Sequence, residues 1–256
     1  MASRGEQRRD AREGGSQMSK FYWILGAVAV VGIGAVGYSV GSQTLGTAAT
    51  EPVDVPGLDN MDTLVQMAQG VTKGDPNAPV TIVEFADYQC PGCGGFALQV
   101  KPQVDLAYVQ TGKAKFVYYD LPLISIHAHS FLAARAGRCA NDQGRFWEFQ
   151  DVIFRNQPTW AAKQTVLGDF VDYAEQAGAD RETFEACLKS DAHADVVTAN
   201  MRLADALGIN GTPTVMISQG RGMARRITQN SFQAIQSVVD GMLAELEAPP
   251  AGPEGD

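Results

Sequence analysis

Most of this chain consists of short runs of apolar or alternating residues, separated by longer stretches with helical periodicity. Runs of five or six such residues, bounded by Gly, Pro or polar residues, predict β-strands. The predicted strands are residues 80–85, 115–119, 214–218 and 224–228. The last two form a predicted hairpin with Gly220 and Gly222 in the turn.

Helical periodicity fills most of the space between these strands. Residues 90–110 predict one helix with a kink at Pro102, because proline breaks the hydrogen bonding of a helix interior. A helical section follows from about 128 to 207, and Ser231 caps a last helix that ends near Leu246. The stops predicted within the section are Gly144, Pro158 and Gly178. This order of elements predicts an α/β layer fold with a helical insertion.

An uncharged segment near the N-terminus has the length of a membrane span. Residues 21–40 carry no charge and cover about 30 Å of hydrocarbon at about 1.5 Å per residue. The positive-inside bias predicts a cytoplasmic N-terminus and an exported remainder, because this segment follows Arg4, Arg8, Arg9, Arg12 and Lys20. A signal peptide cleaved around residues 47–49, which would leave a secreted or periplasmic protein, is the alternative, although its apolar core would be unusually long.

Composition then divides the chain into five parts. Small and polar residues with Pro and Gly indicate a linker after the anchor, and a Pro- and Gly-rich end indicates a disordered tail. The predicted parts are a cytoplasmic basic tail (1–20), a transmembrane anchor (21–41), a linker (42–62), a folded domain (63–246) with its helical insertion at about 124–208, and a disordered tail (247–256).

The charge of the chain argues against nucleic acid as a partner. It carries 20 basic and 29 acidic residues, a net charge of −9, and the predicted exported part is more acidic because the basic tail stays behind. No metal, nucleotide or flavin motif is present. His127, His129 and His193 have no ligand spacing to any cysteine, and the first two are expected to cap a helix or face solvent.

The chemistry of the chain is concentrated in Cys90-Pro91-Gly92-Cys93, which follows the first strand and opens a helix. A helix N-terminus stabilises a thiolate, the form of cysteine that attacks disulfides, and proline fits the first helical turn. Cys90 is therefore the predicted exposed, attacking cysteine, and Cys93, about one turn deeper, the resolving one. The pair needs no cofactor beyond its own disulfide. Half of a zinc site is the alternative, but a second cysteine pair at ligand spacing is missing.

Cys139 and Cys187 lie singly in two predicted helices. If the first two cysteines form a redox pair, these two can form a structural disulfide in an oxidising compartment. Two buried free thiols are the alternative.

Thr212-Pro213, at the start of the third strand, is the second informative motif. X-Pro is the only common route to a cis peptide, and a cis bond here could leave the Thr212 backbone free to pair with an extended substrate. Taken alone, this run indicates only a turn.

Three motifs in this order resemble the DsbA-like thioredoxin-fold proteins, and most of all their membrane-tethered branch. They are residues 74–93 (GDPNAPVTIVEFADYQCPGC), 139–147 (CANDQGRFW) and 207–214 (LGINGTPT), within a resemblance over about residues 70–246. The resemblance implies a thioredoxin fold interrupted by a helical domain, a cis Pro213 facing the disulfide, and a structural bridge between Cys139 and Cys187. The dipeptide Pro91-Gly92 departs from it, because the family's strongest oxidants have a histidine there.

Glu84 is an acidic residue in an otherwise apolar strand, on the face opposite Val83 and Phe85. The resemblance matches it to a buried acid beneath the active site that helps move a proton from Cys93 as Cys93 attacks. A solvated residue, or one paired with Lys113 or Lys115, is the alternative.

The resemblance implies oxidation of reduced exported client proteins, with reoxidation by a membrane enzyme of the DsbB or vitamin-K-epoxide-reductase (VKOR) type. Two alternatives remain open at this point. One is an extracytoplasmic disulfide reductase or isomerase that uses the same motif. The other is a non-enzymatic chaperone that holds clients on an apolar surface, for example around Phe96, Leu123 and Ile209.

Overall fold

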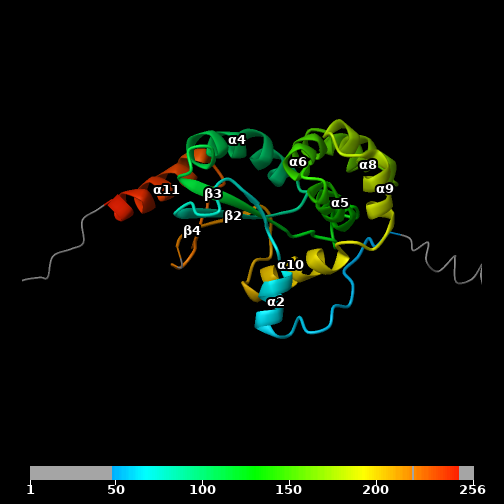
Figure 1. Cartoon of the computed structure of the whole chain (residues 1–256), viewed down its shortest axis with the longest axis horizontal. Coiled ribbons are helices and arrows are strands. Elements are labelled where there is room, and N and C mark those ends of the chain that lie inside the picture. The colour runs from blue at the N-terminus through cyan, green and yellow to red at the C-terminus, as the bar shows by residue number, and fades with distance from the viewer. Residues whose placement is uncertain (1–47, 221, 248–256) are drawn as a thin grey trace, which may run out of the picture. The chain divides into compact units, whose positions relative to one another are not determined.

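The computed structural model describes residues 48–220 and 222–247 (Figure 1). The predicted cytoplasmic tail (1–20) and transmembrane anchor (21–41) lie outside the described residues, as do residues 248–256 of the predicted C-terminal tail. Of the helices that are described, none combines the length and hydropathy needed to cross a bilayer.

A five-stranded mixed sheet forms the centre of the domain, in the order β1-β3-β2-β4-β5. Its strands are β1 (Val71–Lys73), β2 (Val80–Ala86), β3 (Ala114–Asp120), β4 (Thr214–Gln219) and β5 (Arg225–Arg226). β2 and β3 are parallel, and the other neighbouring strands are antiparallel. The three longer strands match their predicted positions within about a residue, whereas β1 was not predicted and β5 is shorter than expected.

Helices cover both faces of this sheet and form the insertion between β3 and β4. They are α2 (Met61–Met67), α3 (Pro91–Gly95), α4 (Lys101–Val104), α5 (Ser130–Asp142), α6 (Phe146–Arg155), α7 (Gln157–Trp160), α8 (Leu167–Gln176), α9 (Arg181–Lys189), α10 (Ala194–Ala206) and α11 (Phe232–Glu247). Two π-helical segments, η1 (Phe96–Val100) and η2 (Asp105–Val109), flank α4. The helical insertion therefore falls within the predicted range.

The two faces of the central strand β2 contact different parts of the chain. Ile82 and Ala86 point into the large core, which also contains Cys93. Phe85 points to the other face and packs in a second cluster with Ala204 of α10. In Figure 1, α4 lies over one side of the sheet, and α10 and α2 lie on the other. Glu84 alternates with Phe85 and so belongs to the face of the large core.

The helical run after β2 is irregular around Pro102, as predicted, and the irregularity is π-helical. The N–H of Lys101 donates to the carbonyl of Phe96, five residues earlier. The N–H of Gln110 donates to the carbonyl of Asp105 at 2.8 Å. Pro102 lies between these two wide turns, where its missing N–H removes one regular helical bond.

Two of the three residues predicted to end helices in the insertion lie in turns between helices. Gly144 follows α5 and Gly178 follows α8, with φ of 67° and 85°, a region that favours glycine. Pro158, the third, instead lies in the first turn of α7, where a missing N–H has no helical partner to lose.

The described part of the predicted linker contacts the helical insertion. The buried guanidinium of Arg135 donates to the carbonyl of Ala49 at 2.8 Å, and the N–H of Val53 donates to Thr198 Oγ1 at 3.1 Å. The Asn60 side chain accepts from two backbone N–H groups and caps α2. Residues 48–60 are therefore held against the domain at several points.

Candidate active site

Cys90 and Cys93 lie where β2 passes into α3. Cys90 is the N-cap residue of α3, Pro91 occupies the first helical position, and Cys93 lies in the first turn. Both cysteines are free thiols. Cys93 is fully buried at 0% exposure, and Cys90 retains 8%, less than the exposed position expected from the sequence. An incoming sulfur atom can therefore reach Cys90 and not Cys93.

The surroundings of the two thiols shift their pKa values in opposite directions. The pKa of Cys90 is lowered to about 5, chiefly by hydrogen bonding from the Cys93 thiol and further by Thr212 and the N–H groups of α3, against the effect of burial. The pKa of Cys93 is raised, first by burial and then by its hydrogen bond to Cys90 and the charge of Glu84. Cys90 is thus the group that carries a thiolate near neutral pH.

Glu84 is a buried acid on the same side of the sheet as Cys93. Its side chain is 1% exposed, and neither carboxyl oxygen has a hydrogen-bond partner within the described part of the chain. Burial raises the pKa of Glu84 to about 8, the charge of Lys101 opposes that shift, and the charge of Cys90 adds to it. Glu84 can therefore hold a proton at neutral pH.

The pairing of Glu84 with Lys113 or Lys115, considered as an alternative, is not formed among the described residues. Lys115 Nζ donates instead to the carbonyl of Pro76 at 2.7 Å. The cation that acts on Glu84 is the buried Lys101, whose Nζ lies 3.2 Å from Asp105 Oδ2 and 4.7 Å from the ring centroid of Trp147.

The loop before β4 closes over Cys90. The Thr212-Pro213 peptide is cis, and the carbonyl oxygen of Thr212 lies 3.5 Å from Cys90 Sγ. A Cβ atom at Gly92 would lie 3.3 Å from Pro213 Cδ, so the two loops already touch and Gly92 limits the crowding between them. This contact brings together the two motifs singled out in the sequence.

Asp87 was missed in the sequence, although it lies three residues before Cys90. It is buried, its N–H donates to Cys93 Sγ at 3.4 Å, and its carboxylate accepts from the N–H of Leu123 and contacts His127 Nδ1 at 2.7 Å. The expectation that His127 caps a helix or faces solvent is therefore wrong. His129 is the N-cap residue of α5, and its Nε2 contacts the exposed carbonyl of Lys163 at 2.7 Å. An acidic residue at the end of a buried strand was the available signal.

Gln157 of α7 was also missed, and no motif marked it. Its Nε2 donates to the carbonyl of Tyr88 at 2.6 Å and to the carbonyl of Cys90 at 2.9 Å. Gly94 allows this approach, because a Cβ there would lie 2.9 Å from Gln157 Oε1. The helical insertion thus holds the backbone of the redox motif.

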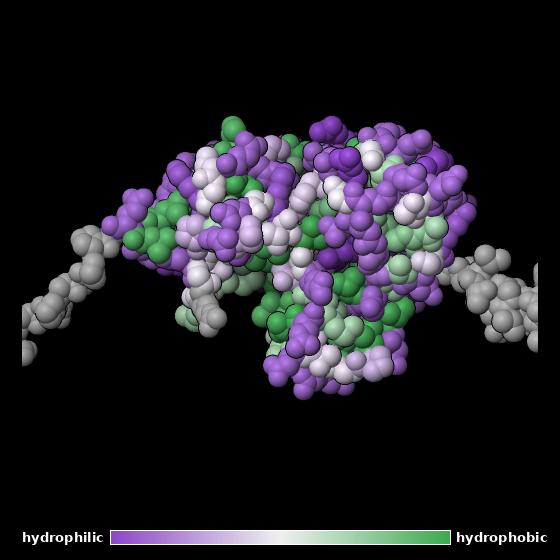
Figure 2. All heavy atoms as spheres, viewed as in Figure 1, coloured by the Kyte–Doolittle hydropathy of each residue, from purple (hydrophilic) through white to green (hydrophobic). Residues whose placement is uncertain are grey.

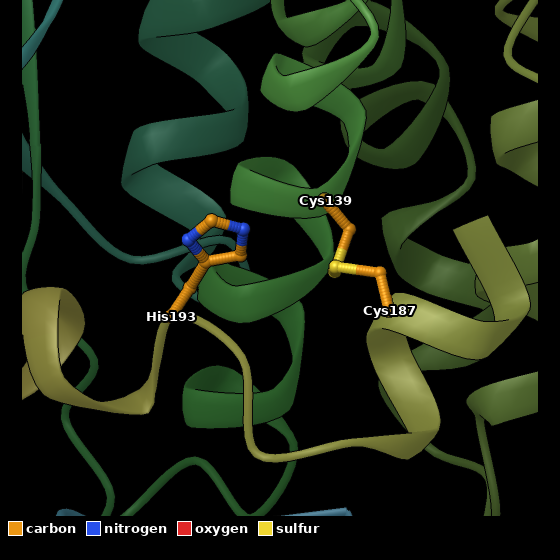
Figure 3. Close-up of side chains that lie close together, drawn as sticks. All are labelled: Cys139, Cys187 and His193. Atoms are coloured by element: carbon orange, nitrogen blue, oxygen red, sulfur yellow. A yellow bond between two sulfur atoms is a disulfide. The ribbon is translucent and has the colours of Figure 1, made fainter. Parts of the chain in front are cut away.

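Cys139 and Cys187 form a disulfide between α5 and α9, with Cα atoms 5.9 Å apart (Figure 3). His193 lies beside it, and its Nε2 contacts Asp142 Oδ2 at 2.7 Å. The three residues have ligand atoms within 4.8 Å of one another. Sulfur atoms joined in a disulfide are not thiolates, so in this form they do not offer zinc its usual ligands.

Comparison with known proteins shows the family. A family model described as "Thioredoxin" matches residues 66–240, most of the described chain. The chain therefore belongs to the thioredoxin family, and the fold that contains its Cys90-Cys93 motif is the DsbA-like form with a helical insertion.

Two solved structures share this fold. BdbD from Bacillus subtilis in its oxidised form has a TM-score of 0.61 and is 23% identical in sequence. The match covers 78% of this chain and 100% of the BdbD chain. The α-DsbA1 protein of Wolbachia pipientis has a TM-score of 0.60 and 20% identity, and covers 75% of this chain and 94% of its own.

Curated relatives match by sequence over part of their length. Disulfide bond formation protein D of Bacillus subtilis is 30% identical over 149 residues, which are 57% of this chain and 66% of that protein. Na(+)/H(+) antiporter NhaA 3 of Salinispora tropica is 31% identical over 180 residues, which are 70% of this chain and 26% of the antiporter. The chain thus spans about a quarter of the antiporter it matches.

Proposed function

We propose that this protein is a thiol-disulfide oxidoreductase that introduces disulfides into exported proteins through Cys90 and Cys93. The observation that carries the proposal is the placement of the two thiols, with Cys90 at the N-terminus of α3 and 8% exposed and Cys93 fully buried one turn further on. Their pKa values shift in opposite directions, down for Cys90 and up for Cys93. A pair of this kind has one stable thiolate that a client can reach and one protected thiol that reforms the bond.

The reaction begins with the oxidised Cys90-Cys93 disulfide. A client thiolate attacks Cys90 Sγ, the enzyme's disulfide breaks, and Cys93 leaves and takes up a proton. A second client thiolate then attacks the client sulfur atom of the mixed disulfide, and Cys90 leaves as a thiolate. The client loses two electrons and gains a disulfide, and the enzyme becomes the dithiol.

Three groups of the chain assist these steps. Glu84, which holds a proton at neutral pH, supplies that proton to the leaving Cys93. The hydrogen bonds at the start of α3 stabilise the departing Cys90 thiolate, which favours the reduced enzyme and makes the disulfide oxidising. The Thr212 backbone, 3.5 Å from Cys90 Sγ, is placed to pair with an extended client beside the reacting sulfur.

The N-terminal segment extends the proposal to the membrane. Residues 21–41 would anchor the protein, with the catalytic domain outside the cytoplasm, where disulfides form and persist. The two electrons would pass from the dithiol to a membrane reoxidase of the DsbB or VKOR type. Tethering both proteins to one membrane would raise their effective concentration.

Two single substitutions test this mechanism. Cys90→Ser should abolish oxidation of a reduced client, because no sulfur remains for the client to attack. Cys93→Ser should accumulate mixed disulfides between Cys90 and clients, seen as adducts on non-reducing gels that disappear on reduction. Ser218→Ala, at a site away from the dithiol, is the matched control and should retain full activity. Full activity of both cysteine variants would contradict the mechanism.

A further inference from the structure

A groove of 670 Å³ lies on the side of the domain formed by α10, a volume within the usual range for ligand sites. Three segments line it, residues 52–59, residues 121–125 and the stretch from α10 to Asn210. Its apolar lining includes Leu58, Leu121, Leu123, Met201 and Ile209. In Figure 2, hydrophobic residues lie among hydrophilic ones over α10 and the segment before α2.

This groove lies close to the dithiol, both along the chain and through hydrogen bonds. Ile209 and Asn210 line it and lead directly to Thr212, whose carbonyl lies 3.5 Å from Cys90 Sγ. On the other side, the N–H of Leu123 donates to Asp87 at 2.8 Å, and the N–H of Asp87 donates to Cys93 Sγ. Asp87 and Cys93 are buried, so the link that a client can follow is the one past Thr212. Asn210 lies only two residues before Thr212, so a client chain held beside the Thr212 backbone is within reach of the groove.

The charges at the groove are mostly negative. Asp54, Asp59 and Asp205 are exposed there, and Arg202 is the one basic residue in the groove lining. An apolar floor with acidic groups at its rim is complementary to a segment that combines apolar and basic side chains. A second copy of this chain is a poorer occupant, since each copy carries a net charge of −9.

We propose that this groove binds client segments that carry Lys or Arg beside apolar residues close to the reacting cysteine. The groove thus selects cationic, apolar cysteine-containing segments among exported proteins. This inference rests on the proposed function, because the client must first be a substrate of Cys90.

The test uses two dithiol peptides that are identical except for two Lys or two Glu residues flanking one cysteine. With the full-length oxidised protein, the Lys peptide should be oxidised with a kcat/KM about fivefold higher, roughly the most that one exposed ion pair contributes. The difference should lie in KM, because the rim contacts are equal in ground and transition states. It should shrink in about 1 M salt, where the Debye length is about 3 Å.

A triple variant, Asp54→Asn/Asp59→Asn/Asp205→Asn, should bring the ratio close to one. Its matched control, Glu148→Gln/Asp172→Asn/Glu182→Gln, makes the same change of charge on helices that do not line the groove. Both variants should oxidise dithiothreitol at the native rate.

The outcomes separate the groove from the proposed function. Oxidation of dithiothreitol without a preference between the peptides, or an equal loss of preference in both triple variants, would overturn the groove. A concentration-dependent dimer that only the first triple variant dissociates would assign the groove to a second copy and also overturn it. Failure of the native protein to oxidise any dithiol would instead refute the proposed function.

Discussion

Asp87 Oδ2 lies 2.7 Å from His127 Nδ1, forty residues further along the chain, while the N–H of Asp87 donates to Cys93 Sγ at 3.4 Å. One buried aspartate thereby joins the loop that follows β3 to the buried cysteine. Asp87 accepts hydrogen bonds from Leu123 and Gln89 as well, so its carboxylate is held from several sides.

We expect His127→Ala to destabilise the fold by about 1–3 kcal/mol, because it removes one partner of a buried carboxylate. His129→Ala is the matched control, since its ring contacts only an exposed carbonyl, and it should cost less than about 1 kcal/mol. Urea unfolding of both variants measures the difference. Equal decreases in the free energy of unfolding of the two variants would show that the contact between Asp87 and His127 does not stabilise the fold.

The stability of the protein should carry a pH dependence that comes from Glu84. Its pKa is about 8 in the folded chain and 4.5 ordinarily, so between these values the folded chain holds a proton that the unfolded chain has lost. This contribution to stability is present at low pH and falls as the pH rises towards 8. Glu84→Gln should remove it and be a few kcal/mol more stable than the native chain at about pH 9.

Urea midpoints at about pH 5 and about pH 9 measure this effect. The exposed Glu182→Gln is the control, and its stability should follow the native pH dependence. A Glu84→Gln variant with the native dependence would show that the carboxyl group of Glu84 does not stay protonated in the fold.

The same substitution should slow the chemistry. Without the acid of Glu84, the leaving Cys93 has no buried proton donor, and oxidation of a dithiol peptide should fall by about 10²-fold. The native protein should show an inflection near pH 8 in its pH–rate profile, and the variant should lack it. Stopped-flow measurement of the first turnover separates this step from product release, and a native rate at every pH would exclude the role.

The dipeptide between the cysteines should set the reduction potential. A Cys90 pKa of about 5 lies between the values of about 7 and about 3.5 in thioredoxin and DsbA, so the potential should fall between about −270 and −120 mV. Gly92→His should raise it by at least about 30 mV, because a nearby imidazolium stabilises the thiolate further.

Gly92→Ala is the control for crowding against Pro213, since it adds a Cβ without a charge. Its potential should remain close to the native one. Equilibration with glutathione measures all three proteins. A native value near −270 mV would favour the alternative role as a reductase.

The disulfide between Cys139 and Cys187 should contribute mainly to stability. It joins residues 48 positions apart, and on the chain-entropy model Cys139→Ala/Cys187→Ala should cost about 4 kcal/mol. Oxidation of dithiothreitol below the unfolding temperature should be nearly unchanged. Calorimetry and the activity assay together distinguish this outcome from a redox role for the second pair.

Local patterns were enough to predict the strands that have five or more residues, because alternation or a continuous apolar run marks them. β1 has only three residues, which is too short for a period to show. α2 carried a usable signal that composition hid, since Asn60 is a good N-cap in a stretch otherwise typical of a linker.

The same limit applies to the candidate site. Cys90, Cys93, Glu84 and Pro213 stand in or beside motifs, so their neighbours in sequence identify them. Gln157 is different, because its partner carbonyls at Tyr88 and Cys90 lie 69 and 67 residues away and depend on how the insertion docks. Contacts of that kind follow from tertiary packing and leave no periodic trace in the chain.

The two hydrogen bonds from Gln157 make α7 a mechanical part of the redox centre. Any tilt of α7 must either break a bond to the carbonyl of Cys90 or drag that carbonyl with it. The helical insertion is therefore a structural part of the redox site, because it holds the backbone of Cys90. The position of α7 is thereby coupled to the backbone of Cys90, the residue whose bonding partner changes during the reaction.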